Sequence, residues 1–83
     1  MTEFAERQVI LYVTPLCSPC ERLRAYLRSR DVAFRVKDLM MDEDAAEHLE
    51  SRNVRGSPAL EVDGEIVAGP ALDKARIDAM LGL

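Results

Sequence analysis

The stretch Val9-Ile10-Leu11-Tyr12-Val13-Thr14-Pro15-Leu16-Cys17-Ser18-Pro19-Cys20 decides the fold, because it joins a strand pattern to a helix pattern through two cysteines. Residues 9–13 are apolar without interruption and rich in β-branched and aromatic types, which is typical of a strand buried on both faces. Beyond the loop, apolar residues recur at spacings of three and four through residues 18–30, which predicts an amphipathic helix. The Cys-x-x-Cys motif therefore falls where the strand ends and the helix begins.

Two further elements follow along the chain. Over residues 32–37, large apolar side chains alternate with Ala33, Arg35 and Lys37, which is the pattern of a second strand. A strand, a helix and a strand within about 30 residues form a βαβ unit, whose strands are parallel and whose crossover is right-handed. The acidic run Asp42-Glu43-Asp44 suits the N-terminus of a second helix, and Asn53 and Gly56 are expected to end it.

The last third of the chain contains a hairpin signal. Asp63-Gly64 separates two short strand patterns, Ala59–Val62 and Glu65–Ala68, which must therefore be antiparallel. A final helix is expected after Gly69-Pro70, because proline suits the first turn of a helix, and it should continue to Leu83. We therefore expect an α/β fold with the order βαβαββα in one domain, residues 1–83.

Composition excludes several classes of protein. The 83 residues include 11 Lys and Arg against 15 Asp and Glu, and a net charge of −4 opposes binding to nucleic acid or to an anionic membrane. No apolar run approaches the roughly 20 residues of a membrane helix, and residues 1–6 lack the basic start of a signal peptide. We expect a soluble cytoplasmic protein whose two cysteines are chemical rather than architectural.

The position of the two cysteines predicts their roles. Unpaired backbone N–H groups and the helix dipole stabilise an anion at a helix N-terminus, so Cys17 should have a depressed pKa and act as the nucleophile. Cys20 lies one helical turn later on the same face, within bonding reach, and is the predicted resolving thiol. Pro19 is tolerated between them because first-turn N–H groups have no partner within the helix.

Three other uses of the cysteine pair compete with thiol–disulfide chemistry. A zinc site needs four ligands, and the one further donor of that kind is His48, which we expect to be a solvated surface residue on another helix. A purely structural disulfide would close only a short loop and would be opened in a reducing cytosol. The alternative function is an iron–sulfur or metal-carrying module that uses the same cysteines between two chains. Thiol–disulfide chemistry is favoured over all three.

Over nearly its whole length the sequence resembles the glutaredoxin branch of the thioredoxin superfamily. The matching pieces are residues 11–20, residues 54–58, residues 62–65 and Gly69. The resemblance implies a thioredoxin-like, four-stranded mixed sheet flanked by helices, with a cis peptide bond before Pro58. It also implies that the backbone of Ser57 pairs with a substrate chain, and Thr14, Arg55 and Gly69 complete the candidate substrate-binding residues. If the third strand runs antiparallel beside the first, Ser57-Pro58 comes close to Cys17.

Departures from the family pattern concern the reductant. Glutathione-using members resemble Lys-Pro-x-Cys-Pro-Tyr-Cys, whereas Thr14 stands here at the lysine position and Pro19 at the tyrosine position. Arg22 or Arg55 could supply the missing cation. The acid that follows the glycine is displaced to Asp73, a spacing similar to that of the NrdH-redoxin group, which takes electrons from thioredoxin reductase and reduces ribonucleotide reductase.

These resemblances give a set of expectations about partners. We expect a monomer with no tightly bound cofactor and no metal, reduced by thioredoxin reductase in preference to glutathione. Its substrates would be disulfide-bearing proteins, with ribonucleotide reductase as one candidate, or low-molecular-weight mixed disulfides.

Overall fold

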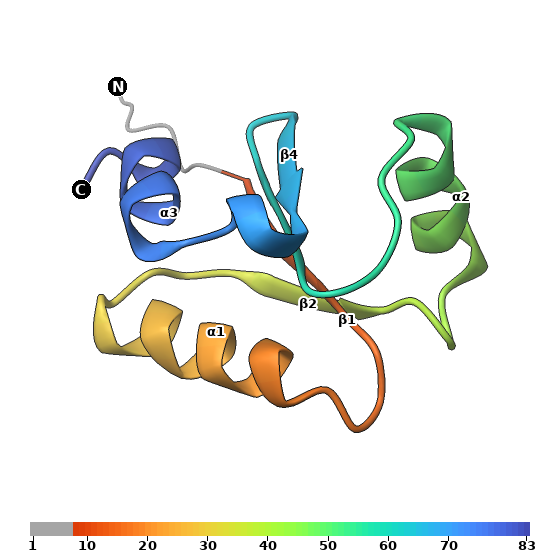
Figure 1. Ribbon diagram of the computed structural model, residues 1–83, viewed down its shortest axis with the longest axis horizontal. Helices are drawn as coiled ribbons and strands as arrows, with labels where there is room; N and C mark the ends of the chain where they lie inside the picture. The colour runs from red at the N-terminus through yellow and green to blue at the C-terminus, as the bar shows by residue number, and fades with distance from the viewer. Residues whose placement is uncertain (1–7) are drawn as a thin grey trace.

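The computed structural model describes residues 8–83, and it contains four strands, three α-helices and one 3₁₀ turn (Figure 1). The elements are β1 (Val9–Val13), α1 (Ser18–Ser29), β2 (Arg35–Asp38), α2 (Glu43–Ser51), β3 (Ala59–Val62), β4 (Glu65–Ala68), η1 (Gly69–Ala71) and α3 (Lys74–Leu81). The prediction made from residues 1–6 lies outside the described part. Within residues 8–83, no helix has the length and apolarity to cross a membrane.

The four strands form one mixed sheet in the order β2-β1-β3-β4. β1 is parallel to β2 and antiparallel to β3, as expected from the βαβ unit and the hairpin. The hairpin turns at Asp63 and Gly64, which both have positive φ, at 49° and 94°, as a two-residue turn of this kind requires. Tyr12 pairs with Ala59, so the segment that enters β3 lies beside the end of β1.

The two faces of the sheet are covered by different helices. Alternate residues of β1 point to opposite faces: Leu11 and Val13 pack with Leu23 of α1 and Ile77 of α3, whereas Tyr12 packs with Ala45 and Leu49 of α2. Figure 1 shows α2 separated from α1 and α3 by the sheet. β1 is therefore buried on both faces, as its uninterrupted apolar run predicts.

Several element boundaries differ from the prediction, most of all the starts of β2 and α3. α3 also ends at Leu81 and not at Leu83, because Gly82 caps it with a left-handed backbone at φ 74°. β2 begins at Arg35 instead of residue 32, because the N–H of Val32 bonds to the carbonyl of Leu27 at the end of α1 instead of to a strand. Val32 and Phe34 still pack against the core, so their alternation reflects burial without strand pairing. α3 begins at Lys74, later than Pro70, because residues 69–71 form only a single 3₁₀ turn.

Asp73 explains where α3 begins. Its carboxylate Oδ1 accepts a hydrogen bond from the N–H of Arg76 at 2.8 Å, which is the bond of an N-cap residue. Aspartate at the N-cap satisfies an N–H that has no partner within the helix, whereas proline at position 70 offers no such side-chain acceptor. The cap therefore places the start of the helix four residues beyond Pro70.

Candidate redox site

Cys17 and Cys20 are joined by a disulfide bond at the N-terminus of α1. Cys17 is the N-cap, with an extended backbone, and its sulfur accepts a hydrogen bond from the N–H of Cys20 at 3.1 Å. Cys17 is partly exposed, whereas Cys20 is 1% exposed and packs in the core. An anion on the Cys17 sulfur would meet an aimed N–H group and the positive end of the helix dipole.

Leu16 brings the chain to Cys17 in an unusual conformation. Its φ is 57°, in the left-handed region, and its side chain is fully exposed. That conformation costs a non-glycine residue roughly 1–2 kcal/mol and is often found beside functional sites. Sequence reasoning missed this feature, because leucine carries no signal for positive φ. The fully exposed apolar side chain lies next to the accessible sulfur.

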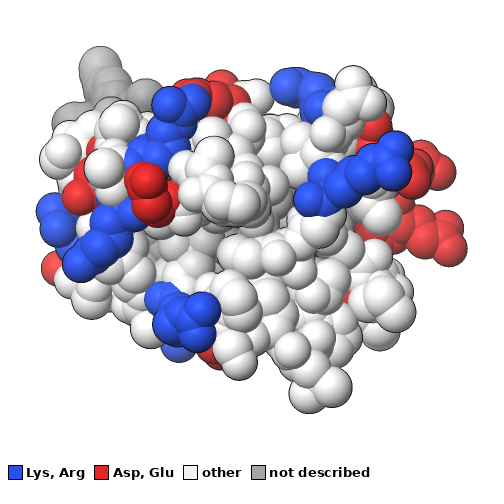
Figure 2. Space-filling view, viewed as in Figure 1, with Lys and Arg blue, Asp and Glu red and all other residues white. Residues whose placement is uncertain are grey.

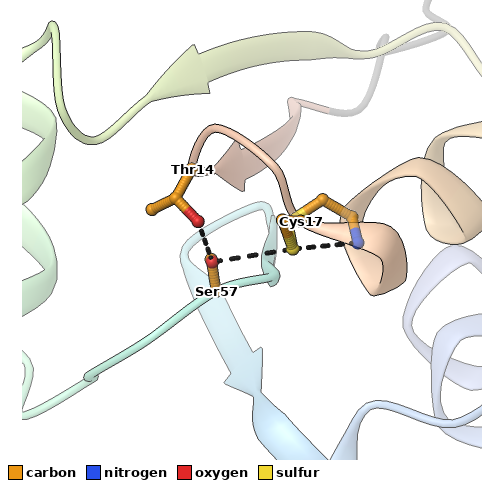
Figure 3. The surroundings of a disulfide bond; sticks show 4 residues. Thr14, Cys17 and Ser57 are labelled. Atoms are coloured by element: carbon orange, nitrogen blue, oxygen red, sulfur yellow. Dashed lines mark hydrogen bonds between the residues drawn. A yellow bond between two sulfur atoms is a disulfide. The ribbon is translucent and has the colours of Figure 1, made fainter.

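Ser57 and Pro58 form the second wall of the site. The Ser57-Pro58 peptide bond is cis, and it immediately precedes β3, which confirms both the predicted bond and the predicted proximity to Cys17. The Ser57 hydroxyl lies 3.8 Å from the Cys17 sulfur and 2.7 Å from the Thr14 hydroxyl (Figure 3). Thr14 directly follows β1, so the pairing of β1 with β3 sets all three side chains side by side.

A groove of about 600 Å³ extends from this wall between α1 and the start of α3. Its lining is mostly apolar and is made by Pro19, Arg22, Leu23, Tyr26, Ser57, Pro58, Gly69, Leu72, Lys74 and Ile77. The charged residues among them are both cations, Arg22 and Lys74. Figure 2 shows few charges on the lower part of this face, over α1 and the loop before it, whereas acidic side chains gather beside α2.

Tyr26, which lines the groove, contacts two charged side chains of α3. Its hydroxyl donates a hydrogen bond to the carboxylate of Asp78, which raises the pKa of Tyr26 above its ordinary value. The Lys74 ammonium lies 5.5 Å from the centre of the Tyr26 ring, a cation–π distance. Tyr26 and Lys74 were not predicted as site residues. The position of Tyr26, four residues after Arg22 on one helix face, was the available signal.

The predicted substrate-binding residues do not all lie together. Ser57, Pro58 and Gly69 line the groove. Thr14 does not line it but is hydrogen-bonded to Ser57. Arg55 is exposed and does not line the groove, whereas Arg22 does. Arg22 also lines a second hollow together with Leu16 and Cys17.

A separate hydrogen-bonded cluster lies on the α2 face of the sheet. The Tyr12 hydroxyl donates to Glu61 Oε1 at 2.7 Å, and His48 Nε2 lies 3.0 Å from the same oxygen. Burial, and then the Glu61 carboxylate, raise the pKa of Tyr12 far above its ordinary value. His48 lies at the surface, as predicted, with its side chain 38% exposed, but its contact with Glu61 was not predicted. Within residues 8–83, no group of three or more His, Cys, Asp or Glu side chains could hold a metal ion.

The sheet order, the Cys-x-x-Cys motif at the start of α1 and the cis-proline before β3 together define a thioredoxin-like fold. A crystal structure of the thioredoxin-like protein BC3987 has a TM-score of 0.79 and 26% identity, over 88% of this chain and 99% of that one. Glutaredoxin 1 from Francisella tularensis, crystallised with cacodylate, has a TM-score of 0.71 and 18% identity, over 93% of this chain and 99% of that one, which shows a shared fold.

Sequence comparison then narrows the class. The profile of the glutaredoxin family matches residues 9–67, so the chain belongs to the glutaredoxin family. An uncharacterized glutaredoxin-like 8.6 kDa protein in the rubredoxin operon of Clostridium pasteurianum is 32% identical over 74 residues, which are 86% of this chain and 93% of that protein.

Proposed function

We propose that this protein is a thiol–disulfide oxidoreductase that reduces protein disulfides, or low-molecular-weight mixed disulfides, through Cys17 and Cys20. The observation that carries the proposal is the difference in exposure between the two sulfurs. Cys17 is partly exposed at the N-terminus of α1, whereas Cys20 is 1% exposed behind it. One sulfur can therefore reach a partner while the other can reach only the first. This arrangement suits an attacking thiol and a resolving thiol.

The reaction proceeds in two exchanges. The Cys17 thiolate attacks one sulfur of the partner's disulfide, a mixed disulfide forms, and the second partner sulfur leaves as a thiolate. Cys20 then loses its proton and attacks the Cys17 sulfur, which releases the first partner sulfur as a thiolate. Two electrons pass to the partner, whose two thiolates can take up the proton that Cys20 lost and a second proton from solvent, and Cys17 and Cys20 are left as a disulfide. An external reductant returns the two electrons.

The groove beside Cys17 supports a polypeptide as the substrate. Ser57 and Pro58 line it, and an extended chain can pair with the backbone of Ser57 as a strand pairs with a sheet edge. Gly69 lines it as well, beside Pro58, because Ala68 pairs with Ala59. Apolar lining with two cations, Arg22 and Lys74, suits a segment that carries apolar and acidic side chains near its disulfide. Ribonucleotide reductase is a candidate partner, on the resemblance to NrdH-redoxins alone.

We infer that thioredoxin reductase, rather than glutathione, is the reductant. Tight recognition of glutathione needs cations and an acid at set positions around the exposed sulfur. Thr14 brings no cation and its hydroxyl bonds to Ser57. The displaced acid, Asp73, caps α3 and does not line the groove. The proposed activity needs no tightly bound cofactor and proceeds in a monomer.

The test couples reduction of a model protein disulfide, insulin, to NADPH oxidation through thioredoxin reductase, with glutathione and glutathione reductase as the second system. We expect turnover that depends on the protein and disappears in Cys17→Ser. The same preparation, purified without oxygen, is examined by visible absorption and by sedimentation. A brown dimer that absorbs visible light and lacks reductase activity would replace the proposal with an iron–sulfur module. A colourless monomer without reductase activity would also overturn the proposal.

A further inference from the structure

Three side chains from separate parts of the chain form a line that ends on the accessible sulfur. The Thr14 and Ser57 hydroxyl oxygens are 2.7 Å apart, and the Ser57 oxygen is 3.8 Å from the Cys17 sulfur. Figure 3 shows Ser57 between the other two, while the N–H of Cys20 approaches the same sulfur from the helix. All three side chains in the line are partly buried, which limits competition from water.

The charge on the sulfur decides which way the hydroxyl protons point. Each hydroxyl has one proton, so the Thr14–Ser57 bond can run in either direction while Cys17 is in a disulfide. A thiolate is a strong acceptor with no proton of its own. It would draw the Ser57 proton toward itself, and the Ser57 oxygen would then accept the proton of Thr14. Hydrogen bonds to a charged acceptor are also shorter, so the 3.8 Å separation would be expected to shorten.

We propose that Thr14 and Ser57 form a hydroxyl relay that stabilises the Cys17 thiolate, with Ser57 contacting the sulfur and Thr14 orienting Ser57. Thr14 is therefore a positioning residue that acts through Ser57. The hydroxyl groups would stabilise the Cys17 thiolate without the lysine that the glutathione-using pattern has at position 14. The inference rests on the proposed function, because it assigns these hydroxyls to the attacking thiolate of that reaction.

A purely structural role for the Thr14–Ser57 bond makes a different prediction. The bond ties the loop after β1 to the loop before β3, and in that role its loss would lower the free energy of unfolding only. A relay requires in addition that the loss moves the pH midpoint at which Cys17 becomes a thiolate. The titration therefore separates the two roles, and a thermal unfolding measurement on each variant records the structural contribution.

The experiment uses the full chain with Cys20→Ser, which leaves Cys17 as the one thiol and keeps the backbone N–H at position 20. Thiolate formation is followed by ultraviolet absorbance and by the pH dependence of alkylation. Ser57→Ala should raise the midpoint by about one pH unit, the size expected for a hydrogen bond to a charged group. Thr14→Val should raise it by less, and Thr14→Ser should restore it. Ser51→Ala, which removes a hydroxyl bonded to the His48 carbonyl, is the matched control and should not move it.

The double variant Thr14→Val with Ser57→Ala tests whether Thr14 acts through Ser57. It should match Ser57→Ala alone, because Thr14 has nothing to orient once the serine hydroxyl is gone. Additive shifts, or an unchanged midpoint in Ser57→Ala, would overturn the relay. If Ser57→Ala does not fold, an unchanged midpoint in Thr14→Val overturns it as well. If the midpoint shifts but the wild-type protein has no reductase activity, the relay stands and the proposed function is wrong. If the midpoint does not shift but the wild-type protein has reductase activity, the proposed function stands and the relay is wrong.

Discussion

The backbone N–H of Cys20 donates a hydrogen bond to the sulfur of Cys17 over 3.1 Å, so the partly exposed sulfur is held by the first turn of the helix that buries the other cysteine. Reduction of the Cys17–Cys20 disulfide would leave a negative charge on the Cys17 sulfur, to which this N–H is already placed to donate. The pair is therefore unsymmetrical in both access and electrostatics.

This asymmetry predicts different behaviour of the two single-cysteine variants. Cys17→Ser should lose all disulfide reductase activity, whereas Cys20→Ser should accumulate a covalent complex with its partner, because no second thiol can release it. Non-reducing gel electrophoresis after mixing with insulin measures the complex. In the reduced wild type, limiting iodoacetamide near neutral pH should label Cys17 first. Peptide mapping that found Cys20 modified preferentially would reverse the assigned roles.

A second prediction concerns the effect of residue 14 on which reductant serves the protein. The wild type should have a higher kcat/KM with thioredoxin reductase than with glutathione, and Thr14→Lys should shift the ratio toward glutathione by adding a cation beside the sulfur. The ratio is the readout, because loss of the threonine hydroxyl affects both reactions. Thr14→Val, which removes the hydroxyl and adds no charge, is the control. If Thr14→Lys and Thr14→Val had equal ratios, the missing cation would not determine the reductant.

A third prediction concerns the basic rim of the groove. Lys74→Gln should raise the KM for a disulfide peptide with acidic residues beside its cysteine by several-fold, and should have little effect on a peptide with lysines there. Lys74 is at the start of α3 and does not line the hollow that contains Cys17, so kcat should stay within about twofold. Arg28→Gln, on an exposed part of α1 outside the groove lining, serves as the matched loss of charge. Equal effects of both variants would show general charge attraction in place of a docking groove.

The sequence predicted best the features that depend on neighbouring residues. β1 is an unbroken apolar run, and the Asp63-Gly64 hairpin has local turn chemistry, so their bounds agree with the structure. The start of α3 was misplaced because two local signals competed. Proline at position 70 suits a first turn, but Asp73 offers a side-chain acceptor, and the cap prevailed.

Contacts between residues far apart in the sequence were predictable only where the order and direction of the strands determine them. The antiparallel placement of β3 beside β1 correctly brought Ser57 to Cys17, 40 residues apart. The bond between Ser57 and Thr14 depends in addition on the rotamers of two hydroxyl side chains, which no pattern encodes. The contact of His48 with Glu61 was missed for the same reason, since it joins α2 to β3 across 13 residues of chain.

The Tyr12–Glu61 bond makes a prediction about stability at alkaline pH. The pKa of Tyr12 is raised in the folded chain by burial and by Glu61, whereas the unfolded chain loses this proton near pH 10. Above that pH the unfolded state binds fewer protons than the folded state, so stability present below pH 10 should be lost as the pH rises. One such group contributes at most about 1.4 kcal/mol of loss per pH unit.

Urea unfolding at pH 8 and pH 11 measures this loss. At pH 8, Tyr12→Phe should be less stable than the wild type by about 1 kcal/mol, because Glu61 loses a hydrogen-bond donor. The difference should shrink or change sign at pH 11, since the phenylalanine variant has no proton to lose there. Tyr26→Phe is the comparison, because the other tyrosine of the chain also has a raised pKa but lies in a more exposed position, and it should show the smaller change with pH. Parallel loss of stability in the wild type and in Tyr12→Phe between the two pH values would mean that Tyr12 loses its proton in the folded chain as readily as in the unfolded one, contrary to its burial against the Glu61 carboxylate.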